Sequence, residues 1–291
     1  MSPRTICLFK RKGFKNMTLA GGNDGIRTIY EGENFGFSDY TYFKQLHLGA
    51  IFQTHMHICM GVFKKNKNAD WLTRTYHYFD LHAGPGLYTH NGVIIKGSPI
   101  IFAETLLSVG GLKCQAHFFE IDNDLRTRLL QNLAHYTTKA EFYISLHGDH
   151  HHFLPCYFDP PDALRPRKRY GLIYSDPAGS MPPFELLSRF FEGKSYTQMD
   201  VLIYIAPTNL KRQLNSPRCP VQMRLEDYLK LIPKRHWIIR EPYGRHQWTF
   251  LIGTNWTDFP VFERLGFYRW DSPKGKEIFA KLNYTNEELA V

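Results

Sequence analysis

The stretch YFDLHAGPGLYTHNG, residues 78–92, joins an apolar run to a turn of small residues. Aromatic residues lead up to Asp80, and the chain then becomes small and flexible at AGPG (83–86). This change is typical of a strand that ends in a glycine turn, where backbone amides can approach a ligand closely. The stretch is not the dinucleotide-binding G-x-G-x-x-G motif, because no third glycine follows until Gly92, and it lacks the Gly-Lys-Ser/Thr of a Walker A loop.

The composition of the chain is that of a globular protein with a basic surface. Its 291 residues are 43% hydrophobic and 22% charged, which supports a well-formed core. The formal net charge of +9 favours a polyanionic partner such as nucleic acid, although many basic proteins bind none.

The sequence predicts a cytoplasmic protein without a membrane partner. No apolar run approaches the roughly 20 residues that cross a bilayer, and the N-terminus lacks the features of a secretory signal. The cysteines are dispersed and form no CxxC pair, which predicts reduced thiols rather than a disulfide framework or a zinc site. They are Cys7, Cys59, Cys114, Cys156 and Cys219.

Strand and helix patterns alternate along most of the chain. Strands are predicted at 75–81, 113–121, 140–147, 169–176, 199–207, 236–241 and 247–255. Helices are predicted at 43–63, 98–110, 122–136, 182–193 and 223–232. This order indicates a doubly wound α/β fold with a mostly parallel sheet, and the short final connection indicates a C-terminal antiparallel hairpin.

One domain with an N-terminal extension is the predicted organisation. Residues 1–42 are expected to form an arm or cap, 43–270 the main domain, and 271–291 a C-terminal tail packed on it.

Acidic residues follow several of the predicted strands. Glu120 follows the second strand and could accept hydrogen bonds from both hydroxyls of a ribose, whereas Asp149 follows the third and could accept from an adenine amine. Asp176 follows the fourth strand and precedes Pro177. Taken alone, Glu120 could instead be a helix cap, Asp149 a turn residue, and Asp80 with its glycines a structural strand-to-helix turn. Ligands of parallel sheets bind at the carboxyl ends of the strands, so the set together favours an adenosine-containing cofactor.

These motifs resemble those of class I S-adenosylmethionine-dependent methyltransferases. The chain is most similar to the three-Cys-motif partner protein family and more distantly similar to the large-subunit ribosomal RNA adenine-N6 methyltransferases. The resemblance covers about residues 43–255. The motifs that carry it are DLHAGPG (80–86), GSP (97–99), FFEID (118–122), GD (148–149) and DPAG (176–179). It implies a Rossmann-like sheet of seven strands.

The resemblance also implies S-adenosylmethionine as the cofactor. Its methionine part would lie against Asp80 and the glycines, its ribose against Glu120 and its adenine against Asp149. The implied cofactor-binding residues are Asp80, His82, Gly84, Gly86, Ser98, Glu120 and Asp149.

Asp176 and Pro177 are the implied catalytic residues, facing the methyl acceptor. In amino-methyltransferases this motif is Asp/Asn-Pro-Pro-Tyr/Phe, whose acid and backbone carbonyl accept hydrogen bonds from the target amine. Here DPAG (176–179) lacks the second proline and the aromatic residue. A stacking partner would therefore come from Phe184, Tyr88 or Tyr204. The predicted reaction is methylation of a nucleic-acid base, with the N6 amine of adenine in DNA or RNA as the favoured acceptor.

The run RPRKRY (165–170) is the densest basic segment. We expect it to lie near the ends of the third and fourth strands, where it could bind phosphates, although a solvated charge run is nearly as consistent with the sequence. The implied nucleic-acid-binding residues are Arg165, Arg167, Lys168 and Arg169. The histidines around Asp149 suggest a metal site, but neighbouring residues on one loop rarely point at one ion, and we predict no metal.

Two other functions stay open at the level of sequence. The altered DPAG motif is consistent with a catalytically silent methyltransferase-like module that binds nucleic acid or protein. Alternatively, the methyl acceptor is a small molecule or a protein. The resemblance to the three-Cys-motif partner family further implies a partner protein, which the sequence does not identify.

Overall fold

The computed structural model of the chain describes residues 30–31, 41–90, 92–158, 167–177, 180–207, 224–242 and 248–283. The strands are β1 (Tyr30–Glu31), β2 (Leu72–Asp80), β3 (Leu87–His90), β4 (Val93–Lys96), β5 (Cys114–Phe119), β6 (Phe142–His147), β7 (Lys168–Ser175), β8 (Asp200–Ile205), β9 (His236–Arg240), β10 (Thr249–Thr254) and β11 (Phe267–Arg269). The helices are α1 (Thr41–Lys65), α2 (Ser98–Val109), α3 (Asn123–Thr137), α4 (His150–Phe153), the 3₁₀ helix η1 (Leu154–Tyr157), α5 (Phe184–Glu192), α7 (Leu225–Leu231), α8 (Pro260–Glu263) and α9 (Pro273–Asn283).

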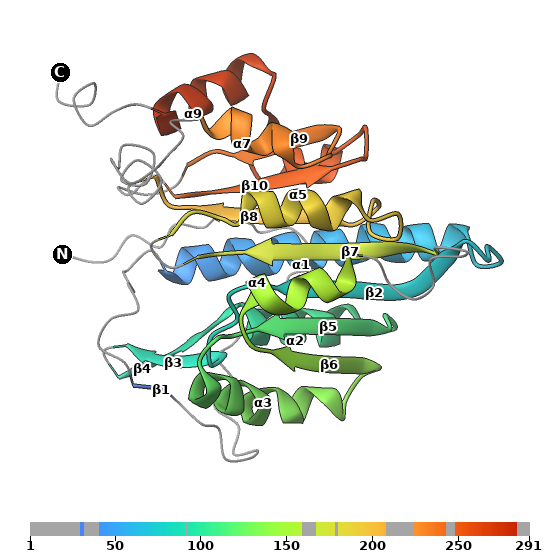
Figure 1. Cartoon of the computed structure of the whole chain (residues 1–291), viewed down its shortest axis with the longest axis vertical. Helices are drawn as coiled ribbons and strands as arrows, with labels where there is room; N and C mark the ends of the chain where they lie inside the picture. Colours follow the sequence, from blue (N-terminus) through green and yellow to red (C-terminus); the bar gives the residue numbers. More distant parts are fainter. Residues whose placement is uncertain are drawn as a thin grey trace, which may run out of the picture.

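A large sheet runs through the molecule in the order β11-β9-β10-β8-β7-β2-β5-β6 (Figure 1). Strands β6, β5, β2, β7 and β8 are mutually parallel, whereas β10 is antiparallel to both β8 and β9. This arrangement confirms the predicted α/β fold, a mostly parallel Rossmann-like sheet with antiparallel strands near the C-terminus. The described sheet has eight strands rather than seven, because the short strand β11 pairs with β9 at the edge.

A second, three-stranded sheet follows the glycine turn and has the order β1-β3-β4. Strands β3 and β4 form an antiparallel hairpin, and β1 pairs in parallel with β3, with Tyr30 opposite Tyr88. The sequence pattern did not predict these strands. Part of the expected N-terminal arm thus joins the segment after the glycine turn. The predicted boundaries 1–42, 43–270 and 271–291 themselves stay predictions.

Helices cover both faces of the large sheet and divide the core in two. Apolar residues of α1, α2 and α3 pack with strand residues in one cluster, and those of α5, α7 and α9 pack in the other. Apolar side chains lie on both faces of the central strands, as is expected for parallel strands covered on both sides.

Helix α1 is joined to the sheet by buried polar contacts. His55 Nε2 lies 3.0 Å from Asp200 Oδ2 on β8, and His55 Nδ1 lies 2.7 Å from Tyr76 Oη on β2. The imidazole ring also stacks on Trp256. Because these groups are buried, their mutual hydrogen bonds compensate for lost contacts with water and fix the position of α1.

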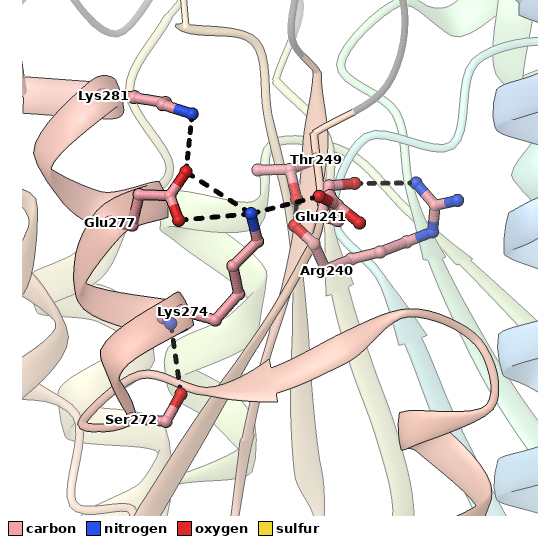
Figure 2. Close-up of polar contacts among 8 residues, drawn as sticks. Arg240, Glu241, Thr249, Ser272, Lys274, Glu277 and Lys281 are labelled. Atoms are coloured by element: carbon pink, nitrogen blue, oxygen red, sulfur yellow. Dashed lines mark hydrogen bonds and ion pairs between the residues drawn. The ribbon is translucent and has the colours of Figure 1, made fainter.

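Helix α9 packs on the part of the large sheet that the C-terminal strands β9 and β11 form. Ile278, Phe279 and Leu282 are buried. The Lys274 ammonium lies 3.4 Å from Glu241 just after β9 and 3.2 Å from Glu277 one turn along the helix (Figure 2). These contacts place the start of the predicted tail against the domain.

Among the described helices, none has the length and apolar character needed to span a membrane.

Candidate functional site

The predicted acidic residues lie at one edge of the large sheet. Asp80 ends β2, Glu120 follows β5, Asp149 follows β6 and Asp176 follows β7. These strands are parallel neighbours, so their carboxyl ends lie at the same side, and the arrowheads of β5, β6 and β7 point that way in Figure 1. The sheet therefore brings the four acids together at the carboxyl ends of its parallel strands, where ligands of such folds bind.

Asp80 is fully buried at the end of β2. Its Oδ2 accepts a hydrogen bond from Tyr78 Oη at 3.1 Å, and its Oδ1 accepts one from the His82 amide at 3.3 Å. Burial raises the pKa of Asp80 to about 7, partly offset by hydrogen bonds from Ser98, the His82 amide and Tyr78. The negative charge of Asp80 is therefore poorly solvated, and a cation brought against it would be stabilised.

His82 connects the glycine turn to the DPAG motif. Its amide donates to Asp80, and its Nδ1 accepts a hydrogen bond from the Asp176 amide at 3.2 Å. Burial lowers the pKa of His82 to about 3, with a further contribution from His150. A neutral ring that accepts at Nδ1 carries its proton at Nε2. His82 thus fixes the distance between the predicted cofactor side and the predicted acceptor side.

The glycine turn fits tightly against its neighbours. The Gly84 amide donates to Glu120 Oε2 at 2.9 Å, and Gly84 has φ +61°. A Cβ atom added there would lie 2.0 Å from Tyr88 Oη. Gly86 has φ +80°, and a Cβ there would lie 3.0 Å from Leu129 Cδ1 on α3. The first glycine therefore admits Tyr88 beside the turn, and the second allows α3 to pack against it.

Tyr88, on β3, lies within the group of acids. Burial raises the pKa of its hydroxyl, and the charges of Glu120, Asp80 and Asp176 raise it further. The hydroxyl therefore stays protonated at neutral pH. It lies beside the glycine turn, which makes Tyr88 part of this site.

Glu120 is held by backbone amides on both of its oxygens. Oε2 accepts from Gly84, and Oε1 accepts from the Asp122 amide at 3.0 Å. Asp122, in contrast, caps α3 by accepting from the amides of Asp124 and Leu125. The two neighbouring acids are thereby separated in role: Asp122 is the helix cap, and Glu120 joins β5 to the glycine turn.

Asp149 caps the short helix α4 by accepting a hydrogen bond from the His151 amide at 2.9 Å. Potential ligand atoms of Asp149, His150 and His151, the cap and the first two residues of α4, lie within 4.8 Å of one another. The His150 ring also packs edge-on against His82, with centroids 4.9 Å apart. The loop that is predicted to contact adenine thus touches the centre of the site. The prediction of no metal stays a prediction.

Asp176 is paired with a residue of α1. The Lys44 ammonium lies 2.6 Å from Asp176 Oδ2, and Tyr174 Oη donates to the same oxygen at 3.0 Å. Lys44 also lies 3.6 Å from the centroid of the Tyr204 ring on β8. Pro177 is buried, and residues 178–179 of the motif lie outside the described residues. A lysine, a carboxylate and an aromatic ring therefore meet at the end of β7.

Sequence reasoning missed Lys44, Tyr78 and Tyr174. The two tyrosines each precede an aspartate by two residues, in YFD (78–80) and YSD (174–176). Side chains two apart on a strand lie on the same face, so this repeated Tyr-x-Asp spacing is a usable signal. Lys44 has no such signal, because its partner is 132 residues away.

The three aromatic candidates for stacking have different positions. Phe184 is buried and its ring stacks on Tyr228 with centroids 5.0 Å apart, so its predicted role beside the acceptor is wrong. Tyr88 and Tyr204, by contrast, lie beside the carboxylates described above.

The basic run does not lie where we expected it. Lys168 and Arg169 are the first residues of β7, so they lie at the opposite edge of the sheet from Asp176. Lys168 Nζ donates to Lys194 O and Thr197 Oγ1, and the Arg169 guanidinium lies over the Tyr196 ring. Placement near the carboxyl ends of the strands is wrong for Arg167, Lys168 and Arg169, because Arg167 directly precedes β7 and the other two begin it. Arg165 lies outside the described residues, and binding of nucleic acid by the run stays a prediction.

Comparison with known proteins gives similarities only among solved structures. No protein-family model and no curated protein matches the sequence. A Legionella pneumophila protein of the DUF519 family is 13% identical, with a TM-score of 0.44 over 75% of this chain and 89% of its own. A Clostridium thermocellum protein described as a candidate rRNA methylase is 14% identical, with a TM-score of 0.39 over 70% and 95%.

A further similar structure is a Listeria monocytogenes protein described as a candidate class I S-adenosylmethionine-dependent methyltransferase. It is 13% identical, with a TM-score of 0.37 over 72% of this chain and 61% of its own. The strand order is that of a mostly parallel, Rossmann-like α/β sheet with antiparallel strands near the C-terminus. Neither of the two families that the motifs resemble is identified by these comparisons.

Proposed function

We propose that this protein transfers a methyl group from S-adenosylmethionine to an amine of a nucleic-acid base, with the N6 amine of adenine as the favoured acceptor. The observation that carries the proposal is the double contact of His82. Its amide donates a hydrogen bond to Asp80, and its ring accepts one from the Asp176 amide. A single residue therefore bridges the predicted cofactor-binding acid and the predicted acceptor motif.

The site fits the amino-acid end of this cofactor. Asp80 is buried, and burial raises its pKa more than the hydrogen bonds from Ser98, the His82 amide and Tyr78 lower it. The α-ammonium of methionine would stabilise its ionised form. Glu120 uses its oxygens for two amides, but an ionised carboxylate has about four acceptor positions and can also accept from ribose hydroxyls. Asp149 would accept from the adenine amine.

When bound, S-adenosylmethionine supplies an electrophilic methyl group on its sulfonium. The remaining task of the protein is to hold an amine nitrogen in line with that methyl. Asp176 would accept a hydrogen bond from the amine, so that the nitrogen lone pair points at the donor. Orientation of this kind can supply several kcal/mol, about 7–11 in well-aligned intramolecular reactions, without a covalent intermediate.

Lys44 and Tyr204 would complete the acceptor side. The Lys44 ammonium holds the Asp176 carboxylate and is itself held over the Tyr204 ring. Tyr204 and Tyr88 are the described aromatic residues beside the carboxylates on which a flipped-out base could stack. They would replace the aromatic residue that the DPAG sequence lacks.

The test combines binding with product analysis. Calorimetric titration of the native chain with S-adenosylhomocysteine is expected to show micromolar binding, which Asp80→Ala abolishes. Incubation with S-adenosylmethionine and RNA or DNA, followed by mass spectrometry of the nucleosides, is expected to show N6-methyladenosine or its deoxy form. The product is expected to be lost in Asp176→Ala.

The outcomes separate the alternatives. Cofactor binding without turnover on any RNA or DNA would support the silent module instead. Methylation of a protein or small molecule alone would retain the enzyme but exclude a nucleic-acid acceptor. Absence of S-adenosylhomocysteine binding by the folded chain would contradict the proposed function itself.

A further inference from the structure

A cavity of about 650 Å³ lies at the amino ends of the parallel strands, on the side of the sheet opposite to the candidate site. It is formed by the end of α1, the amino ends of β2 and β5 and the residue before β7. Figure 1 shows the end of α1 and the starts of β2 and β7 on the same side, away from the strand arrowheads. Its volume is in the range of small-ligand sites and would admit one nucleotide.

A bulge in β2 shapes this cavity. Leu72 pairs with Lys168 and Tyr76 pairs with Tyr170, so four steps along β2 match two steps along β7. Residues 73–75 therefore lie opposite the single residue Arg169, and they line the cavity together with the buried Leu72. Bulges often re-aim side chains next to binding sites, and here the bulge directs the Arg74 segment into the wall.

The wall of the cavity is strongly basic. Lys64, Arg74, Lys113 and Arg167 line it, against the single acid Glu141. The four basic side chains come from four separate parts of the chain, which only the fold brings together. Arg74 is oriented by a hydrogen bond from Nη1 to Lys67 O. A cluster of at least four cations in a concave surface attracts phosphates.

Two exposed aromatic residues flank the basic cavity. Trp71 immediately precedes β2 and is 48% exposed. Tyr143 on the edge strand β6 is 56% exposed, and the Lys113 ammonium lies 5.4 Å from its ring centroid. Exposed flat rings beside cations are a usual means of binding unpaired bases.

We propose that this side of the sheet, at the amino ends of the strands, binds single-stranded nucleic acid, with phosphates in the basic cavity and bases on Trp71 and Tyr143. Strand β7 spans eight residues between these amino ends and Asp176, a separation of roughly 26 Å at about 3.3 Å per residue. The amino ends are therefore a second contact, distinct from the place of methyl transfer. This contact requires neither cofactor binding nor catalysis.

The experiment measures fluorescence anisotropy of a labelled single-stranded 12-nucleotide RNA with the full-length chain. The test variant is Lys64→Ala/Lys113→Ala/Arg167→Ala, all exposed positions on the cavity wall. The control variant is Lys230→Ala/Lys276→Ala/Lys281→Ala, which removes the same charge from α7 and α9. We expect the affinity to fall at least tenfold in the test variant and less than twofold in the control.

The salt dependence gives a second readout. Each lost phosphate contact lowers the slope of log affinity against log salt by about 0.7 for single strands, so the test variant is expected to lose about 2 in slope. Trp71→Ala is expected to weaken RNA binding about fivefold or more, through loss of stacking. Inorganic phosphate and adenosine monophosphate serve as competitors.

Several outcomes would overturn the proposal. Equal losses in the test and control variants would show a general charge effect, and an unaffected test variant would exclude the cavity. Binding of free adenosine monophosphate but not of RNA would make it a nucleotide site instead. S-adenosylhomocysteine binding, measured in each variant, checks folding and keeps this result separate from the proposed methyl transfer.

Discussion

The ammonium of Lys44 lies 2.6 Å from Asp176 Oδ2 and thereby joins the first turns of α1 to the end of β7. Both side chains are about three-quarters buried, so the pair is screened less than a surface ion pair. The same ammonium packs over the Tyr204 ring. Helix α1 is therefore part of the candidate site as well as of the core.

Replacement of Lys44 by Met should reduce methyl transfer at least about tenfold while S-adenosylhomocysteine affinity stays within about twofold. The reason is that Lys44 donates a hydrogen bond to Asp176, the predicted acceptor-binding carboxylate. Loss of a hydrogen bond between charged groups costs about 1.5–3 kcal/mol. Lys44→Arg should retain part of the activity. Initial rates and calorimetry provide the measurements.

Lys230→Met is the matched control, since Lys230 pairs with Asp227 on the surface. Equal activity in Lys44→Met and the native protein would remove Lys44 from the acceptor side.

The affinity for S-adenosylhomocysteine should increase between pH 6 and 7.5. Burial raises the pKa of Asp80 to about 7, so this carboxylate, the proposed partner of the ligand ammonium, is mostly protonated at pH 6 and mostly ionised at pH 7.5. The ionised fraction, and with it the affinity, rises roughly eightfold over this interval for such a pKa. Asp80→Asn should bind at least about tenfold more weakly and with little pH dependence. A native affinity that is flat across this range would contradict the assignment.

Gly84→Ala should destabilise the fold by about 2–4 kcal/mol, because Gly84 has a positive φ and a Cβ would lie 2.0 Å from Tyr88 Oη. In a Tyr88→Phe background the nearest remaining ring atom lies at 3.2 Å, and the cost should fall to about 1–2 kcal/mol. Urea unfolding measures these free energies.

Gly92→Ala supplies the control for backbone strain alone, since Gly92 also has positive φ but no atom within 4 Å of its Cβ position. Equal costs for Gly84→Ala and Gly92→Ala would show that contact with Tyr88 adds nothing.

The fold should lose stability as the pH falls below about 6.5. Burial lowers the pKa of His77, His82 and His117 to about 3, whereas in the unfolded chain each is near 6.5. Between these values the unfolded state binds the extra protons, so the free energy of unfolding decreases by about 1.4 kcal/mol per histidine for each pH unit. Asp80 acts in the opposite direction between about pH 4 and 7, because its folded pKa is raised.

Urea unfolding at pH 5 and 7 tests this balance with His117→Gln, which should reduce the pH dependence by about one histidine's share. His152→Gln alters a side chain that is 81% exposed and should leave the dependence unchanged. A stability that is constant from pH 7 to 5 would contradict the burial of neutral histidines.

The sequence by itself determined the class of fold and the acids at the strand ends. Alternation of apolar strands with helices is a local pattern, and parallel strands place their carboxyl ends together, so Asp80, Glu120, Asp149 and Asp176 could be assigned to one edge. The cap at Asp122 is likewise local, since its hydrogen bonds reach only two and three residues along the chain. The short strands β1, β3, β4 and β11 were missed because two to four residues carry too little periodicity.

Only the tertiary structure decided which distant side chains meet. Lys44 reaches Asp176 because α1 packs across β7, and Lys64, Lys113 and Arg167 share a cavity because a bulge in β2 opens it. The basic run likewise proved to begin β7, opposite the edge where its charge had suggested a role. The periodicity of apolar residues reports only on local structure within a short window of the sequence. Contacts between distant residues depend on how helices and strands pack against one another, which this periodicity does not contain.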